Sequence, residues 1–416
     1  MGTKVTSTAR ILWDLVSSRP PPEDDYSHHM HLTPMLINEG SPTYTPFYDM
    51  VDRFLDATVG NRGPKQVNSL RRHWEYLLLN LSRGLIMRHW TVVALKKSDY
   101  AGDYWLKRYD LSHTHLKVAV DHLHAEGLIE LLTGKLYADR PMRTRIFPKS
   151  ELAAELWQFF LDSEQPIEPP YICINEPDAG WNEALSSLDE EHPDLGVMIE
   201  INDFLKEHHW ACKGPIRMTF KHSPTQGGRL ITPFQNLPDR RIRLRINTLI
   251  DGEPICEVDF SANHLRLNLV LVAGEDAGET PYEDICELAG GVDRSLAKSF
   301  ITYAMGASNR SKALGAARAN GIGAKTFSKL EYATLKRYPK LELFTGFGLF
   351  AQNLGGHILK RVLHKGVQAG IVALPVHDAV AVNSSNEKWA VATMEEEWSA
   401  QFNGENVRTR LKVDKN

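Results

Sequence analysis

The chain lacks the features of several common protein classes, and each absence narrows what it can be. Its 416 residues include only four cysteines, none of them in a CxxC pair, which argues against a disulfide framework or a structural zinc site. No apolar stretch approaches the roughly 18 residues that a membrane helix needs. The amino-terminal residues show no small-residue cleavage pattern, so we expect no signal peptide. These absences predict a reduced, cytoplasmic protein with no membrane partner.

An excess of positive charge is also missing. The chain has 48 Lys and Arg against 52 Asp and Glu, a formal net charge of −4 at pH 7. It therefore has no global signature of nucleic-acid binding, although a local groove can be basic while the rest of the surface is acidic. With 42% hydrophobic and 24% charged residues the composition is that of an ordinary globular protein. The length predicts two or three domains.

Four segments differ in composition and predict the domain organisation. Residues 1–60, rich in Pro, Gly and acidic residues, are expected to form an N-terminal arm, and residues 61–165 are largely helical. Residues 166–200 have the composition of a linker. Residues 201–416 alternate strand-like and helix-like stretches and should form the larger domain, with RTRLKVDKN near the end as an edge strand.

Part of the second segment has the layout of a winged helix-turn-helix. Ser112 is placed as an N-cap, helical periodicity follows it, and Gly127 closes the helix. The stretches Leu128–Leu132 and Thr144–Phe147 read as two strands joined by a hairpin. The hairpin carries four basic residues, Lys135, Arg140, Arg143 and Arg145. This layout predicts a DNA-binding domain with the helix in the major groove and Arg143 and Arg145 on phosphates; a protein-docking module is the alternative.

Two aspartates interrupt apolar runs in the last segment. Asp259 ends the run in CEVDFSANHLRL (256–267), and Asp378 follows His377 inside GIVALPVHDAVAV (370–382). Because an unpaired buried charge is costly, a strand keeps a carboxylate where the carboxylate serves a purpose. Two such interruptions predict two carboxylates facing one cleft. There they would hold two Mg²⁺ ions for phosphoryl transfer, with Mn²⁺ as a substitute.

Six segments, in the same order along the chain, resemble the family A nucleic-acid polymerases of the DNA polymerase I type. DFSANHLR (259–266) is similar to their motif A and PVHDAV (375–380) to their motif C. The other four are GGRLITPFQNLP (227–238), DRSLAKSFITYAMGAS (293–308, similar to motif B), KRYPKL (336–341) and QNLGGHILKRVL (352–363). The resemblance implies an α+β fold, with an antiparallel-sheet polymerase palm and reduced helical fingers after the mainly helical winged helix-turn-helix domain.

The same resemblance assigns roles around the two carboxylates. Asp259 and Asp378 would be the catalytic metal ligands, and the carbonyl of Phe260 would be a third ligand. Phe260 and Ser261 would shape the nucleotide pocket beside them.

Further residues would bind the substrates. Arg294 and Lys298, one turn apart on a helix, would meet the triphosphate, with Lys298 among the catalytic residues. Arg229 would reach the minor groove at the primer end, Gln352 would contact the template–primer, and His377 would lie near the primer terminus.

The chain also departs from the family at several positions. His264 stands where the family has a glutamate that excludes the ribose 2′-hydroxyl, so it is a nucleotide-binding candidate that could block or admit a ribonucleotide. Ala379 replaces the glutamate after the motif C aspartate. The tyrosine that stacks over the template base falls on Gly306 or Met305, depending on the alignment, and Tyr303 is the candidate to substitute for it.

The predicted function is a template-directed DNA polymerase that lacks proofreading and has low processivity, acting in replication or repair in the nucleoid. The 119 positions from Asp259 to Asp378 (378 − 259) predict small fingers. About 60 residues separate the winged helix from Arg229, too few for a full thumb, so the winged helix would supply the grip on DNA. The expected partners are primer–template, dNTPs, with NTPs left open, and other replication proteins. The alternatives are a primase-like or RNA-synthesising polymerase of the same palm, and a catalytically inactive DNA-binding replication initiator.

Overall fold

The chain divides into two compact units that are not consecutive in sequence. The computed structural model describes residues 20–23, 28–100, 110–137, 140–175, 185–190, 192–239, 242–402 and 407–416. The first unit contains Met1–Ile167, Trp210–Gly214 and Asn236–Thr248, and the second contains Glu168–His209, Pro215–Gln235 and Leu249–Asn416. The chain therefore returns to the first unit twice, whereas the sequence suggested a single linker between two continuous domains.

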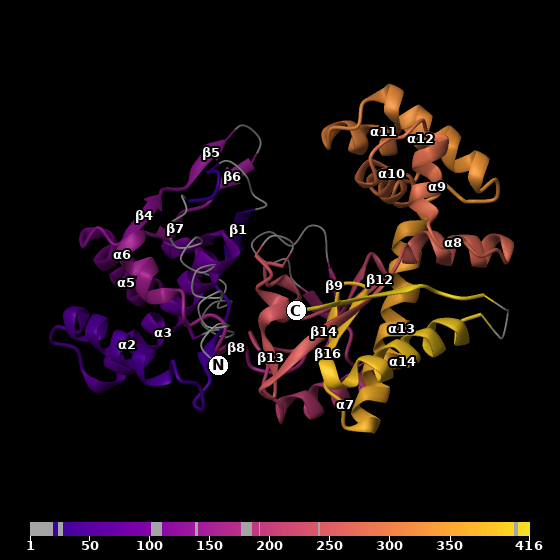
Figure 1. Cartoon of the computed structure of the whole chain (residues 1–416). Coiled ribbons are helices and arrows are strands. Elements are labelled where there is room, and N and C mark those ends of the chain that lie inside the picture. Colours follow the sequence, from indigo (N-terminus) through magenta and orange to yellow (C-terminus); the bar gives the residue numbers. More distant parts are fainter. Residues whose placement is uncertain are drawn as a thin grey trace. The chain divides into compact units, whose positions relative to one another are not determined.

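The first unit combines helices with small sheets (Figure 1). Its helices are α2 (Tyr44–Thr58), α3 (Pro64–Met87), η2 (Lys97–Tyr100), α5 (His113–Ala125), α6 (Ser150–Leu156) and η4 (Arg245–Asn247). Its strands are β1 (His29–His31), β2 (Leu36–Ile37), β3 (Trp90–Val92), β4 (Ile129–Leu132), β5 (Lys135–Tyr137), β6 (Arg140–Met142), β7 (Arg145–Pro148) and β8 (Ser163–Glu164). The main sheet has the order β1-β3-β7-β4, in which only the β1–β3 pair is parallel.

Helix α5 and the strands after it have the layout that the sequence predicted. The Ser112 side chain accepts a hydrogen bond from the His115 main-chain N–H at the start of α5. After the helix, Gly127 has a φ of +69°, which favours glycine. Strand β4 then pairs with β7, and β5 and β6 form the hairpin between them. The order helix, strand, hairpin, strand is thus confirmed.

A fully buried histidine joins α3 to the start of α5. The Nδ1–H of His73 donates to the Ser69 carbonyl at 2.6 Å, and its Nε2 accepts from the Ser112 main-chain N–H at 2.7 Å. Nε2 can accept this bond only while the ring is neutral. Burial lowers the pKa of His73 to about 4.

This histidine predicts a pH dependence of stability. Below pH 6.5 the unfolded chain binds a proton that folded His73 refuses, so the contribution of His73 to stability should fall between about pH 6.5 and 4, by roughly 3 kcal/mol in total, and should be constant above that window. Urea unfolding of wild type and of the His73→Gln variant at a series of pH values measures this fall as the difference between the two chains, in which the contributions of other titrating groups cancel. The His73→Gln variant should be less stable at pH 7 and should lose this part of the pH dependence; an unchanged pH profile would contradict the assignment.

Arg145 does not occupy the position expected of a DNA-binding residue. Its side chain is 4% exposed, and its guanidinium donates to the Glu23 carbonyl at 2.8 Å and lies over the Trp90 ring. Arg145 therefore packs inside the first unit, where a phosphate cannot reach it. Arg143 is half-buried before β7, and the side chains of Lys135 and Arg140 lie outside the described part of the chain.

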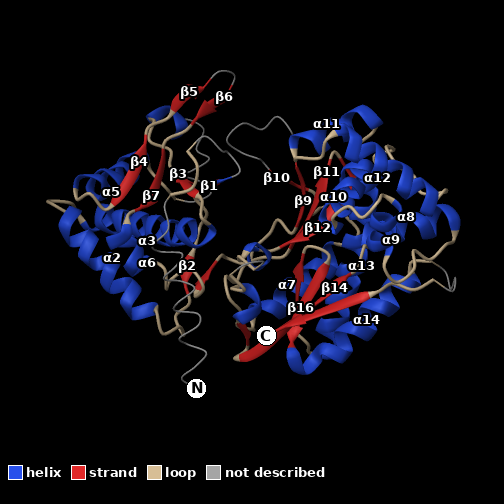
Figure 2. Cartoon of the chain, turned by 45° about the horizontal axis from the view of Figure 1, so that its top comes forward, coloured by secondary structure: helices blue, strands red, loops and turns tan. Residues whose placement is uncertain are grey.

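The second unit contains two sheets and most of the helices (Figure 2). Its helices are α7 (Leu195–Lys206), η3 (Pro233–Asn236), α8 (Asn263–Ala273), α9 (Pro281–Leu288), α10 (Arg294–Gly306), α11 (Arg310–Ala319), α12 (Ala324–Arg337), α13 (Phe347–Ala369), η5 (Ser384–Asn386) and α14 (Glu387–Ala400). Its strands are β9 (Ile172–Asn175), β10 (Leu185–Ser187), β11 (Arg217–Lys221), β12 (Ser223–Ile231), β13 (Leu249–Ile250), β14 (Glu253–Phe260), β15 (Ala373–Val376), β16 (Ala379–Asn383) and β17 (Leu411–Lys415).

The sheets of the second unit are mostly antiparallel, so the α+β class is confirmed. One sheet has the order β10-β9-β11-β12, and its β9 and β10 come from the segment 166–200. That segment is therefore part of a folded sheet, and the linker expected from its composition is wrong for these strands. The other sheet has the order β13-β14-β16-β15, and β17 pairs with β14 on the side away from β16. The edge strand predicted near the end of the sequence is therefore confirmed.

The β14–β16 sheet has one face covered by helices. Val258 pairs with Val380, and both point to one face together with Ala373 of β15. A Cβ added to Gly366 of α13 would lie 3.4 Å from the Cβ of Ala373, so α13 packs on this face. Because side chains alternate along a strand, Asp259 points to the opposite face.

A close backbone contact fixes β12 to α13. A Cβ added to Gly356 would lie 1.9 Å from the Gly228 carbonyl oxygen, so only glycine fits there. Nearby, the Asn353 side chain donates to the Pro224 carbonyl at 3.2 Å. This contact determines where β12 carries Arg229.

In Figure 1, helices α9 to α12 form a group above α8 and α13. Among the described helices, none combines the length and the hydropathy needed to cross a bilayer.

Candidate active site

The pairing of β14 with β16 brings the two predicted aspartates together. Asp259 lies directly across from Ala379, and Asp378 is the residue before Ala379. The two carboxylates, 119 positions apart in the sequence, are therefore neighbours in space. Their separation is determined by the main-chain register of two adjacent strands.

The proximity of these carboxylates affects the pKa of Asp259. Burial, and after it the charge of Asp378, raise the pKa of Asp259 to about 7. The positive charges of Lys298 and Lys412 act against this rise but do not cancel it. Without an added cation, the two carboxylates therefore resist being ionised together at neutral pH.

Asp378 lies in a two-residue hairpin turn between β15 and β16. Val376 pairs with Ala379, so His377 and Asp378 form the loop, and His377 has a φ of +59°. A positive φ at the first loop position is the pattern of a type II′ turn, in which glycine is usual. The exposed His377 is held by its main-chain N–H, which donates to the Gln235 side chain at 3.3 Å.

A second constrained turn follows Asp259. Ala262 has a φ of +54° and turns the chain from β14 into α8. Arg266, which is 1% exposed, donates to the carbonyls of Ser261 at 2.9 Å and Gly278 at 2.7 Å. Arg266 therefore stabilises the turn, which places His264 in the first turn of α8.

His264 lies close enough to Asp378 for the charge of that carboxylate to act on its ring. Burial lowers the pKa of its ring, the charge of Arg229 lowers it further, and the charge of Asp378 opposes this shift. The ring is therefore neutral at pH 7 and close to both charged groups. Arg229 itself is exposed on β12. His264, Asp378 and Arg229, which the sequence analysis placed in one site, are therefore close enough to influence one another's charge.

Helix α10 supplies the cations. Its N-cap is Asp293, whose side chain accepts from the Ser295 main-chain N–H at 2.7 Å. Lys298 is exposed, and its charge acts on Asp259. Arg294, one turn earlier, is 2.5 Å from Glu283 and lies over the Tyr282 ring at 5.2 Å.

Tyr282 is a site residue that the sequence analysis missed. It is buried on α9, and burial raises its pKa to about 12, with the charge of Asp378 acting in the same direction and that of Arg294 against it. Tyr282 therefore lies near both Asp378 and Arg294. The predicted aromatic residue, Tyr303, is 140° around α10 from Lys298 at 100° per residue. Tyr303 therefore does not share the face of Lys298, and its nucleotide-binding role stays a prediction.

Lys412 was also missed. It pairs with Asp259 from β17, on the side of β14 away from β16. The alternation in RLKVDK (410–415) predicts which residues lie on the same face of β17 as Lys412. Nothing in the sequence, however, indicates that β17 pairs with β14, and so nothing places Lys412 beside Asp259.

The donor set fits a hard divalent cation. Asp259 and Asp378 offer carboxylate oxygens, which Mg²⁺ prefers, and a cation would relieve their mutual repulsion. Within the described ranges, no group of three or more His, Cys, Asp or Glu side chains is arranged to hold a metal ion. The remaining ligands would have to come from main-chain carbonyls, water or a bound phosphate, which is usual for Mg²⁺.

No protein-family model matches this chain, and no curated protein matches it.

For the remaining predicted residues, Phe260, Ser261 and Gln352, the structure gives the burial and main-chain contacts below. The Phe260 side chain is 2% exposed and points to the face that α13 covers, so it does not line the site. Ser261 is fixed through its main chain, whose N–H donates to the Arg410 carbonyl at 2.8 Å. Gln352 is half-buried in the first half of α13.

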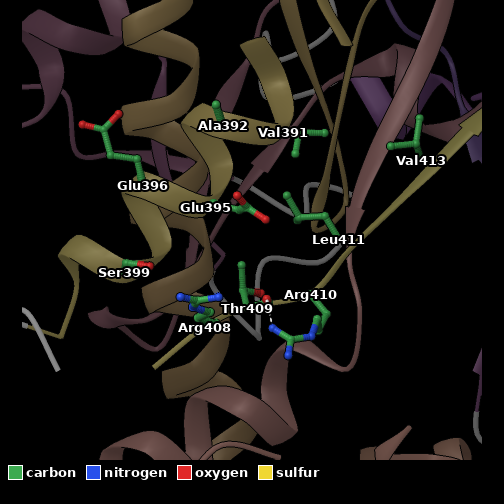
Figure 3. Close-up of a pocket in the computed structure, with 10 residues that line it drawn as sticks. All are labelled: Val391, Ala392, Glu395, Glu396, Ser399, Arg408, Thr409, Arg410, Leu411 and Val413. Carbon is green, nitrogen blue, oxygen red and sulfur yellow. Dashed lines mark hydrogen bonds between the residues drawn. The ribbon is translucent and has the colours of Figure 1, made fainter. Parts of the chain in front are cut away.

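A pocket of about 610 Å³ lies between α14 and β17 (Figure 3). It is lined by Val391, Ala392, Glu395, Glu396, Ser399, Arg408, Thr409, Arg410, Leu411 and Val413. Leu411 and Val413 alternate with Lys412, so they point away from the face of Asp259. The pocket is therefore distinct from the carboxylate site.

Proposed function

We propose that this protein is a template-directed nucleic-acid polymerase, with a polymerase palm and small fingers in the second unit and a winged helix in the first. The observation that carries the proposal is the meeting of Asp259 and Asp378 beside Lys298. Paired carboxylates next to a cationic helix suit transfer of a nucleotidyl group from a triphosphate to a hydroxyl. The order of the six polymerase-like segments supports the same function. DNA synthesis in replication or repair remains the leading proposal, with the nucleoid as its place.

The proposed mechanism assigns one task to each group. Asp259 and Asp378 would hold two Mg²⁺ ions, which when bound supply activation of the primer 3′-hydroxyl and stabilisation of the leaving pyrophosphate. Lys298 and Arg294 would orient the triphosphate; Arg294 is preorganised by Glu283. The exposed cation of Arg229 would contact the primer strand.

Selection between sugars would fall to His264. Because its ring is neutral and half-buried, it can exclude a 2′-hydroxyl by its bulk or donate a hydrogen bond to it. An RNA-synthesising or primase-like activity is therefore the second candidate.

Primer extension tests the proposal directly. The full chain is incubated with Mg²⁺, with primed and unprimed templates, and with either dNTPs or NTPs, beside the Asp259→Ala variant. We expect extension of the primed template with dNTPs and none by the variant. Products from NTPs on an unprimed template would favour the primase-like alternative. No product from wild type in any combination would contradict the proposal and favour a DNA-binding initiator.

We also propose that the hairpin of the first unit contacts nucleic-acid phosphates through Arg143. The Arg143→Gln variant should weaken duplex binding and reduce the slope of log K against log salt by about 0.9, the value for one phosphate contact. Arg145→Gln is the matched comparison. Because Arg145 is buried, this change should lower stability and leave the salt slope unchanged. Equal slopes for wild type and Arg143→Gln would contradict the contact.

A further inference from the structure

The three helices α10 to α12, which include the candidate-site cations Arg294 and Lys298, carry an unusual concentration of positive charge. Residues 294–337 include nine Lys and Arg and a single acidic residue, Glu331, although the whole chain has more acidic than basic residues. Three of the nine are arginines that pair with acidic side chains, Arg294 with Glu283, Arg310 with Glu331 and Arg337 with Asp284. Lysines make up most of the rest.

Helix α12 arranges three of these lysines in one stripe. Lys325, Lys329 and Lys336 are exposed, and none of them forms an ion pair with another described residue. At 100° per residue they lie within about 40° of one another around the helix, over a length of about 16 Å. The stripe is therefore a row of cations without counter-charges.

An aromatic ring lies inside the same stripe. Tyr332 is 66% exposed, the highest value among the large exposed hydrophobic residues of the described chain. It lies one turn before Lys336, whose Nζ is 6.0 Å from the ring centroid. The opposite face of α12 is buried through Phe327 and Leu330, so the fold does not need Tyr332 for its core. A large ring left in water between lysines calls for a ligand with flat faces and negative charge.

We propose that the stripe Lys325–Lys329–Tyr332–Lys336 is a docking surface for single-stranded nucleic acid. The lysines bind successive phosphates, and Tyr332 stacks on an unpaired base. A duplex offers phosphates but keeps its bases stacked on each other, so the exposed ring favours a single strand. The proposal deepens the proposed function and rests on it, because a polymerase substrate includes an unpaired template strand.

Binding of labelled oligonucleotides to the full chain, followed by fluorescence anisotropy in EDTA and without nucleotides, tests the surface. The probes are an oligothymidylate of about 30 residues and a blunt duplex of similar length. In the triple variant Lys325→Gln, Lys329→Gln, Lys336→Gln, the slope of log K against log salt for the single strand should fall by about 2, since each phosphate contact on a single strand contributes roughly 0.7.

Substitution of the ring separates stacking from charge. Tyr332→Ala should weaken binding of the single strand about tenfold without changing the salt slope, and Tyr332→Phe should retain binding. Lys388→Gln, an exposed lysine on α14, is the control for loss of a charge elsewhere in the second unit. All these side chains are exposed, so the thermal unfolding temperatures should match that of wild type.

Two results would overturn the proposal. One is wild-type affinity for the single strand in both the triple variant and Tyr332→Ala; the other is an equal loss of affinity for the duplex, which would indicate a duplex-binding surface. If the stripe variants lose the single strand while wild type extends no primer, the surface stands and the polymerase function fails. If wild type extends primers and the variants bind normally, only the surface fails.

Discussion

Replacing Asp259 with asparagine is expected to abolish nucleotide transfer and, at the same time, to stabilise the metal-free protein. Loss of the negative charge and of one ligand oxygen should cost about 4 kcal/mol of transition-state stabilisation, roughly a 10³-fold fall in the rate of primer extension. Stability should change in the opposite direction because Asp259 carries a charge that its surroundings disfavour.

The sign of the stability change follows from the pKa. The folded-state pKa of about 7 lies above the ordinary aspartate value of 3.8, so between these values the folded protein holds a proton that the unfolded chain releases. The contribution of Asp259 to the stability of metal-free wild type should therefore fall as the pH rises from about 4 to 7. The asparagine variant lacks this fall, and above pH 7 it should be more stable by about 2 kcal/mol or more.

Urea unfolding in EDTA at pH 8 and pH 5 measures the difference, which should shrink at the lower pH. Adding Mg²⁺ should stabilise wild type and leave the variant unchanged. Asp251→Asn is the control: the carboxylate of Asp251 accepts from the His209 main-chain N–H at 2.8 Å, so its loss should destabilise the protein by about 1 kcal/mol. An Asp259→Asn protein less stable than wild type at pH 8 would contradict the electrostatic account.

The second large effect is expected from a single methyl group at Gly356. Its Cβ would lie 1.9 Å from the carbonyl oxygen of Gly228, and both groups belong to the main chain, so neither can rotate away. Gly356→Ala must therefore push β12 from α13, at a cost of about 3 kcal/mol or more. Because β12 carries Arg229, primer extension should fall as well. Thermal unfolding and the extension assay measure the two effects.

The neighbouring glycine is a matched control for this substitution. A Cβ at Gly355 has the Asn263 side chain as its nearest contact, at an ordinary 3.6 Å. Gly355→Ala should therefore leave stability unchanged or raise it by about 0.5–1 kcal/mol through the higher helix propensity of alanine. Equal stability of the two variants would show that the backbone contact is not tight.

The sequence could predict the two aspartates because their signal is local. A charge inside an apolar run is visible without a structure, and the alternation in a strand indicates which neighbours share its face. Ser112 and Gly127 likewise mark the ends of α5 by local rules. Each of these signals depends on residues within one turn or one strand.

The predictions failed where contacts come from distant segments. The burial of Arg145 depends on the Glu23 carbonyl and the Trp90 ring, neither of which is near it in the sequence. The place of Tyr282 depends on how α9 lies against the loop of Asp378, which no periodicity reveals. The linker prediction relied on composition, and composition does not show that β9 pairs with β11.

The position of β17 has a consequence for biosynthesis. Strand β14 obtains its partner β16 from one later part of the chain and β17 from another that is later still. While the polypeptide is being translated, the Asp259 strand therefore exposes unpaired N–H and C=O groups until β17 emerges, and a prematurely terminated product keeps that edge open to other chains. Synthesis of the chain through residue 415 and protection of this strand from aggregation are thus coupled through the pairing of β17 with β14.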